Sequence, residues 1–178
     1  MQKPPLTDRT GDAPVRHKRR AAVPAKLMLL LPDEEATRAL GRRLTGLIRP
    51  GDVIALRGVI GSGKTELARA LIRARSGADI EVPSPSYTLV QDYRFPGLLI
   101  RHIDLYRIRQ PAELLELGLD APAAGEAWLI EWPERAETML PSDRLDLELS
   151  QGDAPGARIA HLNAGPSWIE RLDVLRGA

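Results

Sequence analysis

The loop GVIGSGKT, residues 58–65, constrains the fold of this chain more than any other feature of its sequence. Its glycines, Lys64 and Thr65 match the pattern G-x-x-x-x-G-K-[ST] of a Walker A loop. An apolar run, VIALR, precedes the loop, and a helical pattern with Leu67 and Leu71 on one face follows it. A strand, a glycine-framed turn and a helix in this order predict a P-loop NTPase-like α/β fold.

The residue types of the loop indicate why a lysine stands in this turn. Glycines let backbone N–H groups converge on an oxyanion, and the following helix adds the positive end of its dipole. Lys64 then reaches the β- and γ-phosphates of a nucleotide, and the Thr65 hydroxyl coordinates Mg²⁺. We therefore expect ATP to bind along a continuous stretch: Ile60, Gly61, Ser62, Gly63, Lys64, Thr65 and Glu66.

The remaining pattern alternates strands and helices and then turns to hairpins. Strands are expected over residues 27–31, 53–58, 84–95, 97–108 and 127–132, and QGDAPG joins two more, DRLDLELS and ARIAHLN. Helices are expected over 33–47, 64–75, 111–120 and 167–175. The predicted fold class is a three-layer P-loop NTPase-like fold, whose mixed sheet has a parallel core and antiparallel hairpin strands.

The first 26 residues differ in composition from the rest of the chain. They contain four prolines, few large apolar side chains and the basic run RHKRR at residues 16–20. Such a segment buries too little apolar surface to offset its ordering entropy. We expect a disordered basic arm over 1–26, either nucleic-acid-binding or simply solvated, and one P-loop ATPase domain over 27–178.

Composition excludes several classes of function. Without cysteine, the chain has no disulfide, no thiolate nucleophile and no Cys-based metal site. Its apolar runs, such as residues 27–31, are too short to span a bilayer, and the first twenty residues lack a secretory apolar region. The simplest interpretation is a cytoplasmic protein without membrane contact. His17, His102 and His161 do not cluster in sequence, so each is interpreted as a surface or packing residue.

Two acids end strand-like runs and are candidates for the metal site. LLIRHID ends at Asp104, and AWLIE ends at Glu131. The carboxyl ends of strands border the ligand crevice in an open α/β sheet, so both acids can face the nucleotide. Glu131 follows the cleaner apolar run and is the better Walker B candidate. Either acid could orient the attacking water, and a solvated acid at a strand end is the alternative for each.

Missing motifs narrow the choice among P-loop proteins. The single asparagine, Asn163, is followed by Ala-Gly-Pro, so the guanine-reading N-K-x-D motif of GTPases is absent. No LSGGQ-like stretch indicates a transporter ATPase, and the chain is too short for a two-lobed helicase motor. A small ATPase or a small-molecule kinase remains.

Four stretches, in this order and spacing, resemble the bacterial TsaE family: LRGVIGSGKT, SPSYTLV, HIDLYRI and IEWPE. PDEEATRALGRRL fits the same pattern, and the resemblance covers about residues 30–150. The family consists of P-loop ATPases required for the threonylcarbamoyladenosine modification of tRNA. The resemblance implies that ATP hydrolysis resets a complex with the proteins TsaB and TsaD, and that tRNA is met through that complex.

The resemblance also implies roles for individual residues. Lys64, Asp104 and Glu131 would be catalytic, and Thr65 and Glu131 would hold Mg²⁺. Trp132, beside the Walker B acid, would border the nucleotide, although strand-end packing explains it equally well. Residues 84–88 match a switch-like loop, and residues 34–37 would lie near the nucleotide.

Four positions depart from the family pattern. Val59 stands where an acid is usual and Glu66 where Thr is frequent, while Ser62 and Ser86 replace Ala and Thr. Glu66 favours the helix dipole but places a negative charge near the phosphates, which predicts weaker ATP binding.

Two other functions are kept as alternatives. A small-molecule kinase would need an Arg-rich lid, and the chain after Glu131 turns to hairpin strands instead. A nucleic-acid-binding module would use the basic arm and the cluster of Arg101, Arg107 and Arg109, and its affinity would fall steeply with salt. An ATPase of the predicted kind is expected to be slow alone, with Arg94, Arg107 and Arg135 as arginine-finger candidates within the chain.

Overall fold

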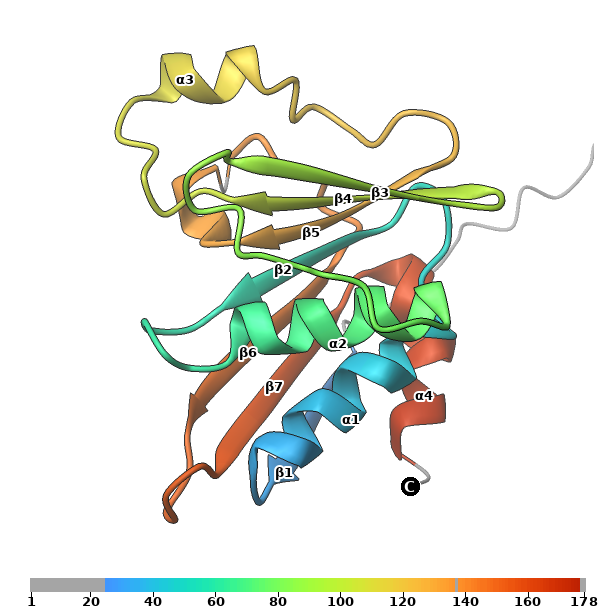
Figure 1. Ribbon diagram of the computed structural model, residues 1–178, viewed down its shortest axis with the longest axis vertical. Helices are drawn as coiled ribbons and strands as arrows, with labels where there is room; N and C mark the ends of the chain where they lie inside the picture. The colour runs from blue at the N-terminus through green and yellow to red at the C-terminus, as the bar shows by residue number, and fades with distance from the viewer. Residues whose placement is uncertain (1–24, 137, 177–178) are drawn as a thin grey trace, which may run out of the picture.

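The loop of residues 58–65, called the phosphate loop from here on, follows the central strand of a seven-stranded sheet (Figure 1). The computed structural model describes residues 25–136 and 138–176. The strands are β1 (Ala25–Leu31), β2 (Val53–Arg57), β3 (Val90–Phe95), β4 (Leu98–Asp104), β5 (Glu126–Glu131), β6 (Leu145–Gln151) and β7 (Arg158–Ala164). The helices are α1 (Glu34–Thr45), α2 (Lys64–Ser76), α3 (Pro111–Glu116) and α4 (Ile169–Arg176), with 3-10 turns η1 (Pro133–Arg135) and η2 (Pro166–Trp168).

The strand order is β1-β7-β6-β2-β5-β4-β3, and its centre is parallel. β2 runs parallel to β5 and β6, and β4 runs parallel to β5. The outer pairs, β3 with β4, β6 with β7 and β1 with β7, are antiparallel. The predicted α/β fold, with a parallel core and antiparallel hairpin strands, is therefore confirmed.

Helices α1, α2 and α4 lie together on one face of the sheet (Figure 1). Their apolar side chains form the larger core with β2, β6 and β7, in which Leu44, Leu71 and Leu147 are fully buried. α1 begins where the Asp33 carboxylate accepts a hydrogen bond from the Ala36 N–H at 2.7 Å, an N-cap that satisfies one free donor. Helix α2 follows the phosphate loop and packs against α1.

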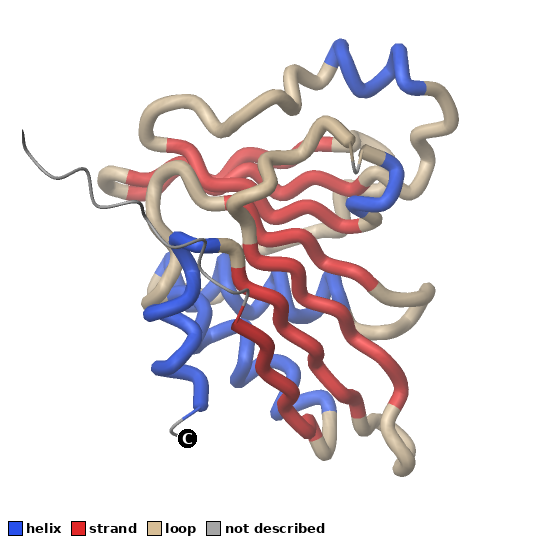
Figure 2. Tube along the Cα trace, turned by 180° about the vertical axis from the view of Figure 1, so that it is seen from behind, coloured by secondary structure: helices blue, strands red, loops and turns tan. Residues whose placement is uncertain are grey.

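The opposite face is covered only at one end of the sheet. The segment 105–125, which includes α3, packs a second core onto β4 and β5 around Trp128 and Ile130. Figure 2, seen from behind, shows no described helix over β6, β7 and β1 on this face. None of the described helices is long and apolar enough to cross a membrane.

The predicted strand boundaries deviate from the structure by one or two residues at several ends and by four or more at two of them. The strand expected from residue 84 begins only at Val90, because Pro83 and Pro85 cannot donate to a ladder and Leu89 has a left-handed φ of 63°. The strand expected to reach residue 108 ends at Asp104. β1 begins at Ala25, so the last two residues of the predicted arm are strand, and residues 1–24 lie outside the described residues.

Candidate functional site

The phosphate loop joins β2 to α2 through three glycines with positive φ, Gly58, Gly61 and Gly63. Gly58 has φ 132°, and a Cβ there would lie 2.4 Å from the Leu149 carbonyl oxygen of β6. Gly63, with φ 102°, is the N-cap of α2. Because the first N–H groups of a helix have no partner within it, the start of α2 leaves donors at the loop. Backbone and helix dipole thus form the anion cradle that the sequence predicts.

Lys64 is held inside this loop by neutral oxygens. Its Nζ donates to the Gly58 carbonyl at 2.7 Å and to the Val59 carbonyl at 3.0 Å. The same Nζ lies 4.0 Å from the ring centroid of Trp132. Burial lowers the pKa of Lys64 below its ordinary value, although Glu131, Glu134 and Asp104 act in the opposite direction. The two carbonyl oxygens that bind Lys64 are neutral, so an oxyanion bound in the loop would provide the negative charge that these hydrogen-bond partners do not.

The two predicted acids lie side by side at the C-terminal ends of two neighbouring strands. Asp104 of β4 is the direct register partner of Glu131 of β5, and both side chains are buried. Glu131 Oε2 accepts a hydrogen bond from the Thr65 hydroxyl at 2.9 Å. That bond joins the phosphate loop to the strand-end acid, the pairing expected of a Walker A and Walker B site.

Asp104 contacts the loop that precedes β3. Its Oδ2 accepts the Ser86 hydroxyl at 2.6 Å and the Ser84 hydroxyl at 3.5 Å. Its Oδ1 accepts the Tyr106 N–H at 2.9 Å. Asp104 thus binds the loop of residues 84–88, whereas Glu131 contacts the phosphate loop.

His102 belongs to the same cluster, although the sequence suggested only a packing residue. Its ring is fully buried, and Nε2 lies 2.9 Å from Glu131 Oε1. His102 and Asp104 are two residues apart on β4, and alternate residues of a strand face the same side. That spacing was the signal available in the sequence, and it gains meaning only once β5 is known to be the neighbouring strand.

Two clefts border the loop and share Gly61, Lys64 and Thr65. The first has a volume of about 370 Å³ and lies between α1, α2 and the β6–β7 hairpin, with Glu34, Thr37 and Arg158 among its lining residues. The second has a volume of about 220 Å³ and is closed by residues from the strand ends and loops: Ile60, Ser84, Ser86, Asp104, Tyr106, Glu131 and Trp132. Except for Ser62, which is buried, the predicted binding residues line one or both of these clefts.

Arg158 is a site residue that the sequence did not reveal. Its Nε donates to the Ser62 carbonyl at 3.0 Å and its Nη2 to the Gly61 carbonyl at 3.2 Å. It stands at the start of β7, far from the loop in sequence, so only the sheet order brings it there. The arginine-finger candidates lie elsewhere in the described chain: Arg94 and Arg135 are exposed, and Arg107 stacks on Tyr87 at 4.1 Å.

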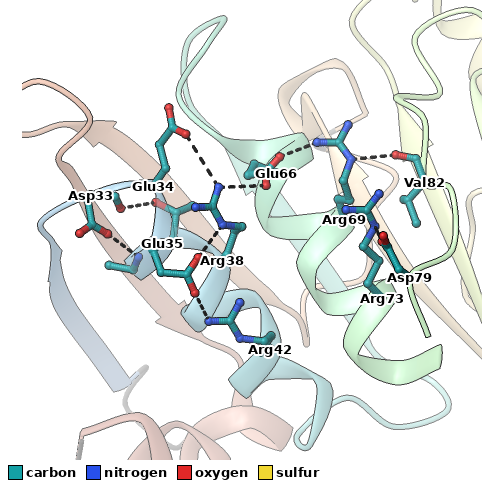
Figure 3. Close-up of polar contacts among 12 residues, drawn as sticks. Asp33, Glu34, Glu35, Arg38, Arg42, Glu66, Arg69, Arg73, Asp79 and Val82 are labelled. Carbon is teal, nitrogen blue, oxygen red and sulfur yellow. Dashed lines mark hydrogen bonds and ion pairs between the residues drawn. The ribbon is translucent and has the colours of Figure 1, made fainter. Parts of the chain in front are cut away.

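The charge of Glu66 is compensated by two guanidinium groups (Figure 3). Arg69, one turn later on α2, donates to its carboxylate. Arg38 of α1 lies 3.5 Å from Glu66 and also donates to Glu35 at 2.8 Å. The repulsion of ATP that the sequence suggested for Glu66 is therefore reduced, because both arginines line the first cleft with it.

Trp132 owes its position to a left-handed backbone. With φ 58°, a conformation that costs a non-glycine residue about 1–3 kcal/mol, it turns the chain sharply after β5. Its ring then lies against Lys64 and 5.0 Å from the ring of Tyr106. Strained residues of this kind concentrate at functional sites, so the geometry favours a role beside the nucleotide over simple packing.

The donor atoms at this point fit Mg²⁺. Thr65 Oγ1 and Glu131 Oε2 are hard oxygen ligands 2.9 Å apart. Mg²⁺ is commonly held by one or two protein oxygens together with phosphates and water. Within the described residues there is no group of three or more His, Cys, Asp or Glu residues that could hold a metal alone. The site thus suits a metal that arrives with phosphate.

Comparison with known sequences finds relatives that share one name. A Rickettsia felis protein named tRNA threonylcarbamoyladenosine biosynthesis protein TsaE is 32% identical over 161 residues, covering 84% of this chain and 94% of its own. The Bacillus subtilis protein of the same name is 32% identical over 118 residues, covering 66% and 73%.

A solved structure shares the fold. The crystal structure of Bacillus subtilis YdiB matches with a TM-score of 0.67 at 23% identity, covering 86% of this chain and 95% of its own. Residues 31–159 match the family described as threonylcarbamoyl adenosine biosynthesis protein TsaE, and this span includes the phosphate loop, both acids, His102 and Arg158. The chain therefore belongs to the TsaE family.

Proposed function

We propose that this protein is a Mg²⁺-dependent ATPase that acts in threonylcarbamoyladenosine biosynthesis in tRNA. The observation that carries the proposal is the hydrogen bond between Thr65 and Glu131, beside the buried Lys64. A plain glycine turn would need none of these three side chains. The family to which the chain belongs, and the names of its relatives, support the pathway.

The two clefts suggest how ATP lies in the site. The phosphates would follow the loop from Gly61 to Thr65, and the nucleoside would occupy the 370 Å³ cleft next to Thr37 and Arg158. The terminal phosphate would then point into the 220 Å³ cleft, where Glu131 and Asp104 meet.

Each side chain then has a stated task in hydrolysis. Lys64 would leave the carbonyls of Gly58 and Val59 and bind the β- and γ-phosphate oxygens. Thr65 and Glu131 would hold Mg²⁺, which when bound neutralises phosphate charge. Asp104 would keep the loop of Ser84 and Ser86 closed over the terminal phosphate. Either acid could orient the attacking water.

The residues that line the 220 Å³ cleft provide little positive charge for the terminal phosphate. Among the described residues that line it, Lys64 is the only cation. Phosphoryl transfer is strongly accelerated when an additional arginine stabilises charge in the transition state. We therefore propose slow hydrolysis by the protein alone and stimulation by TsaB and TsaD, whose complex the hydrolysis would reset.

The direct test is ATP hydrolysis by the purified chain with Mg²⁺, alone and with TsaB, TsaD and tRNA added. We expect a low basal rate and a higher rate with the partners. Glu131→Gln should lower both rates about 10²-fold, since it removes the metal-holding charge. Glu170→Gln, an exposed acid on α4, is the matched control and should change neither rate.

Other outcomes are distinguishable. ATP consumption that appears only with a small-molecule acceptor, together with a phosphorylated product, would favour the kinase. Absence of both binding and hydrolysis in the wild-type protein would contradict the ATPase itself.

Nucleotide binding should be visible in the fluorescence of Trp132. Binding draws Lys64 away from the Trp132 ring, so the emission should change with ATP concentration. The other tryptophans, Trp128 and Trp168, are buried elsewhere and should contribute little. Titration of Trp132→Phe serves as the control: if it shows the same change, the signal does not come from this contact.

A further inference from the structure

The carboxylate of Glu131 lies between two donors that hold different oxygens. Thr65 Oγ1 donates to Oε2 at 2.9 Å, and His102 Nε2 lies 2.9 Å from Oε1. His102 is 0% exposed, so its contact with Oε1 is shielded from water, whereas the Thr65 side of Glu131 borders the 220 Å³ cleft. A buried carboxylate in this setting takes its orientation from its partners.

The surroundings of His102 fix which ring nitrogen carries the proton. Nδ1 is buried and has no hydrogen-bond partner among the residues that the structure describes. A proton on Nδ1 would be a buried unsatisfied donor, whereas a proton on Nε2 is satisfied by Glu131. The hydrogen-bond geometry therefore favours the arrangement in which Nε2–H donates to Glu131 Oε1.

Asp104 does not take part in this contact. Its two oxygens accept from Ser84, Ser86 and the Tyr106 N–H. The two adjacent acids thus have separate sets of donors, and His102 is the one histidine in the described chain placed against either of them. Loss of His102 would remove the hydrogen-bond partner of Glu131 Oε1.

We infer that His102 is a positioning residue of the ATPase site. Its Nε2–H holds Oε1 of Glu131 so that only Oε2 is presented to Thr65 and to the Mg²⁺ of the nucleotide. The part of this inference that concerns Mg²⁺ rests on the proposed function. The contact between His102 and Glu131 is independent of that function. Outer partners that orient a metal ligand in this way typically change metal affinity or activity by about 10- to 100-fold when they are removed.

The test compares three variants that differ in where they place a donor. His102→Gln can place an amide N–H where Nε2 stood, His102→Asn places it nearer to Nδ1, and His102→Leu has no donor. His161→Leu, an exposed position on β7, is the control. The first readout is binding of Mn²⁺, followed by electron paramagnetic resonance, to each protein saturated with a non-hydrolysable ATP analogue.

We expect Mn²⁺ binding to weaken about 10- to 100-fold in His102→Leu and His102→Asn and to recover in His102→Gln. Binding of the analogue without metal should stay unchanged in all of them, because the phosphate loop is intact. Equal Mn²⁺ binding in wild type and His102→Leu would overturn the inference and leave the ATPase standing. Equal weakening in His102→Gln would also overturn it, since the donor position would then be irrelevant.

A second readout needs neither metal nor nucleotide. Nitrogen NMR of the ¹⁵N-histidine-labelled wild-type protein should show His102 as the Nε2–H tautomer. Protonation at Nδ1 would overturn the inference, even if His102→Leu failed to fold. A wild-type protein that shows the expected tautomer but binds no ATP would contradict the proposed function alone.

Discussion

A Lys64→Met variant is expected to hydrolyse ATP about 10²- to 10³-fold more slowly than the wild-type protein. The substitution removes a preorganised positive charge that would stabilise the negative charge developing on the phosphate in the transition state, and the loss of one such group typically lowers the rate by this factor. The variant should nevertheless stay folded. Burial lowers the pKa of Lys64, so its charge opposes folding at neutral pH. That unfavourable contribution is fully present below the folded-state pKa and fades as the pH rises toward the ordinary value of 10.5. Lys64→Met removes this contribution together with the hydrogen bonds to Gly58 and Val59, so the two effects oppose each other and the melting temperature should change little.

The matched control is Lys26→Met, at an exposed lysine on β1. It removes the same charge from the chain but leaves the phosphate loop intact, and its rate of hydrolysis should equal that of the wild type. A Lys64→Met protein with wild-type hydrolysis and wild-type folding would contradict the site assigned here. Measurement of the rate and of thermal unfolding on the same samples separates loss of chemistry from loss of structure.

The largest loss of stability is expected from Asp52→Ala. Arg171 Nη2 donates to Asp52 Oδ1 at 2.9 Å, and both side chains are 8% exposed. The guanidinium also donates to the carbonyls of Leu47 and Ser167 and lies 3.9 Å from the centroid of the Trp168 ring. Removal of one partner leaves a buried charge uncompensated, which costs about 3–5 kcal/mol, or roughly 6–20 °C in melting temperature for a chain of this size.

Two comparisons define the source of this loss. Asp173→Ala breaks an exposed pair with Arg176 at 3.0 Å, and it should change stability by less than about 1 kcal/mol. The double variant Asp52→Ala/Arg171→Met removes both charges and should be more stable than Asp52→Ala alone. If both single variants, Asp52→Ala and Asp173→Ala, lost equally little stability, the buried pair would carry no special weight. Asp52 ends the turn that leads into β2, at the opposite end of the strand from the phosphate loop, so chemical denaturation tests it independently of hydrolysis.

The phosphate loop could be predicted from the sequence because its conformation is demanded locally. Gly58 and Gly63 need positive φ, and the helix and strand around them have clear periodic patterns. The prolines at 83 and 85 were also a local signal, and they limited β3 more than its apolar alternation suggested. Local chemistry of this kind is visible in one chain without any knowledge of its neighbours.

His102 and Arg158 could not be recognised in the same way. Each acquires its role from a contact with a strand or loop distant in sequence: Glu131 for His102, and Gly61 with Ser62 for Arg158. A periodic pattern shows which face of a strand is buried, but it does not give strand order. Asp104 and Glu131 were found because a general rule places strand ends at the ligand crevice of α/β sheets.

The position of β2 has a consequence for the order in which the protein assembles. Ile54, just before the phosphate loop, pairs with Leu129 on one side and Leu145 on the other, both synthesised much later. Bringing such distant segments together costs more chain entropy than forming the local contacts between α1 and α2, and it is therefore slower. During synthesis the loop emerges early, but Glu131 reaches Thr65 only after β5 has left the ribosome. The nascent chain thus passes through an interval in which the loop 58–65 is complete but the acid that contacts it is still missing.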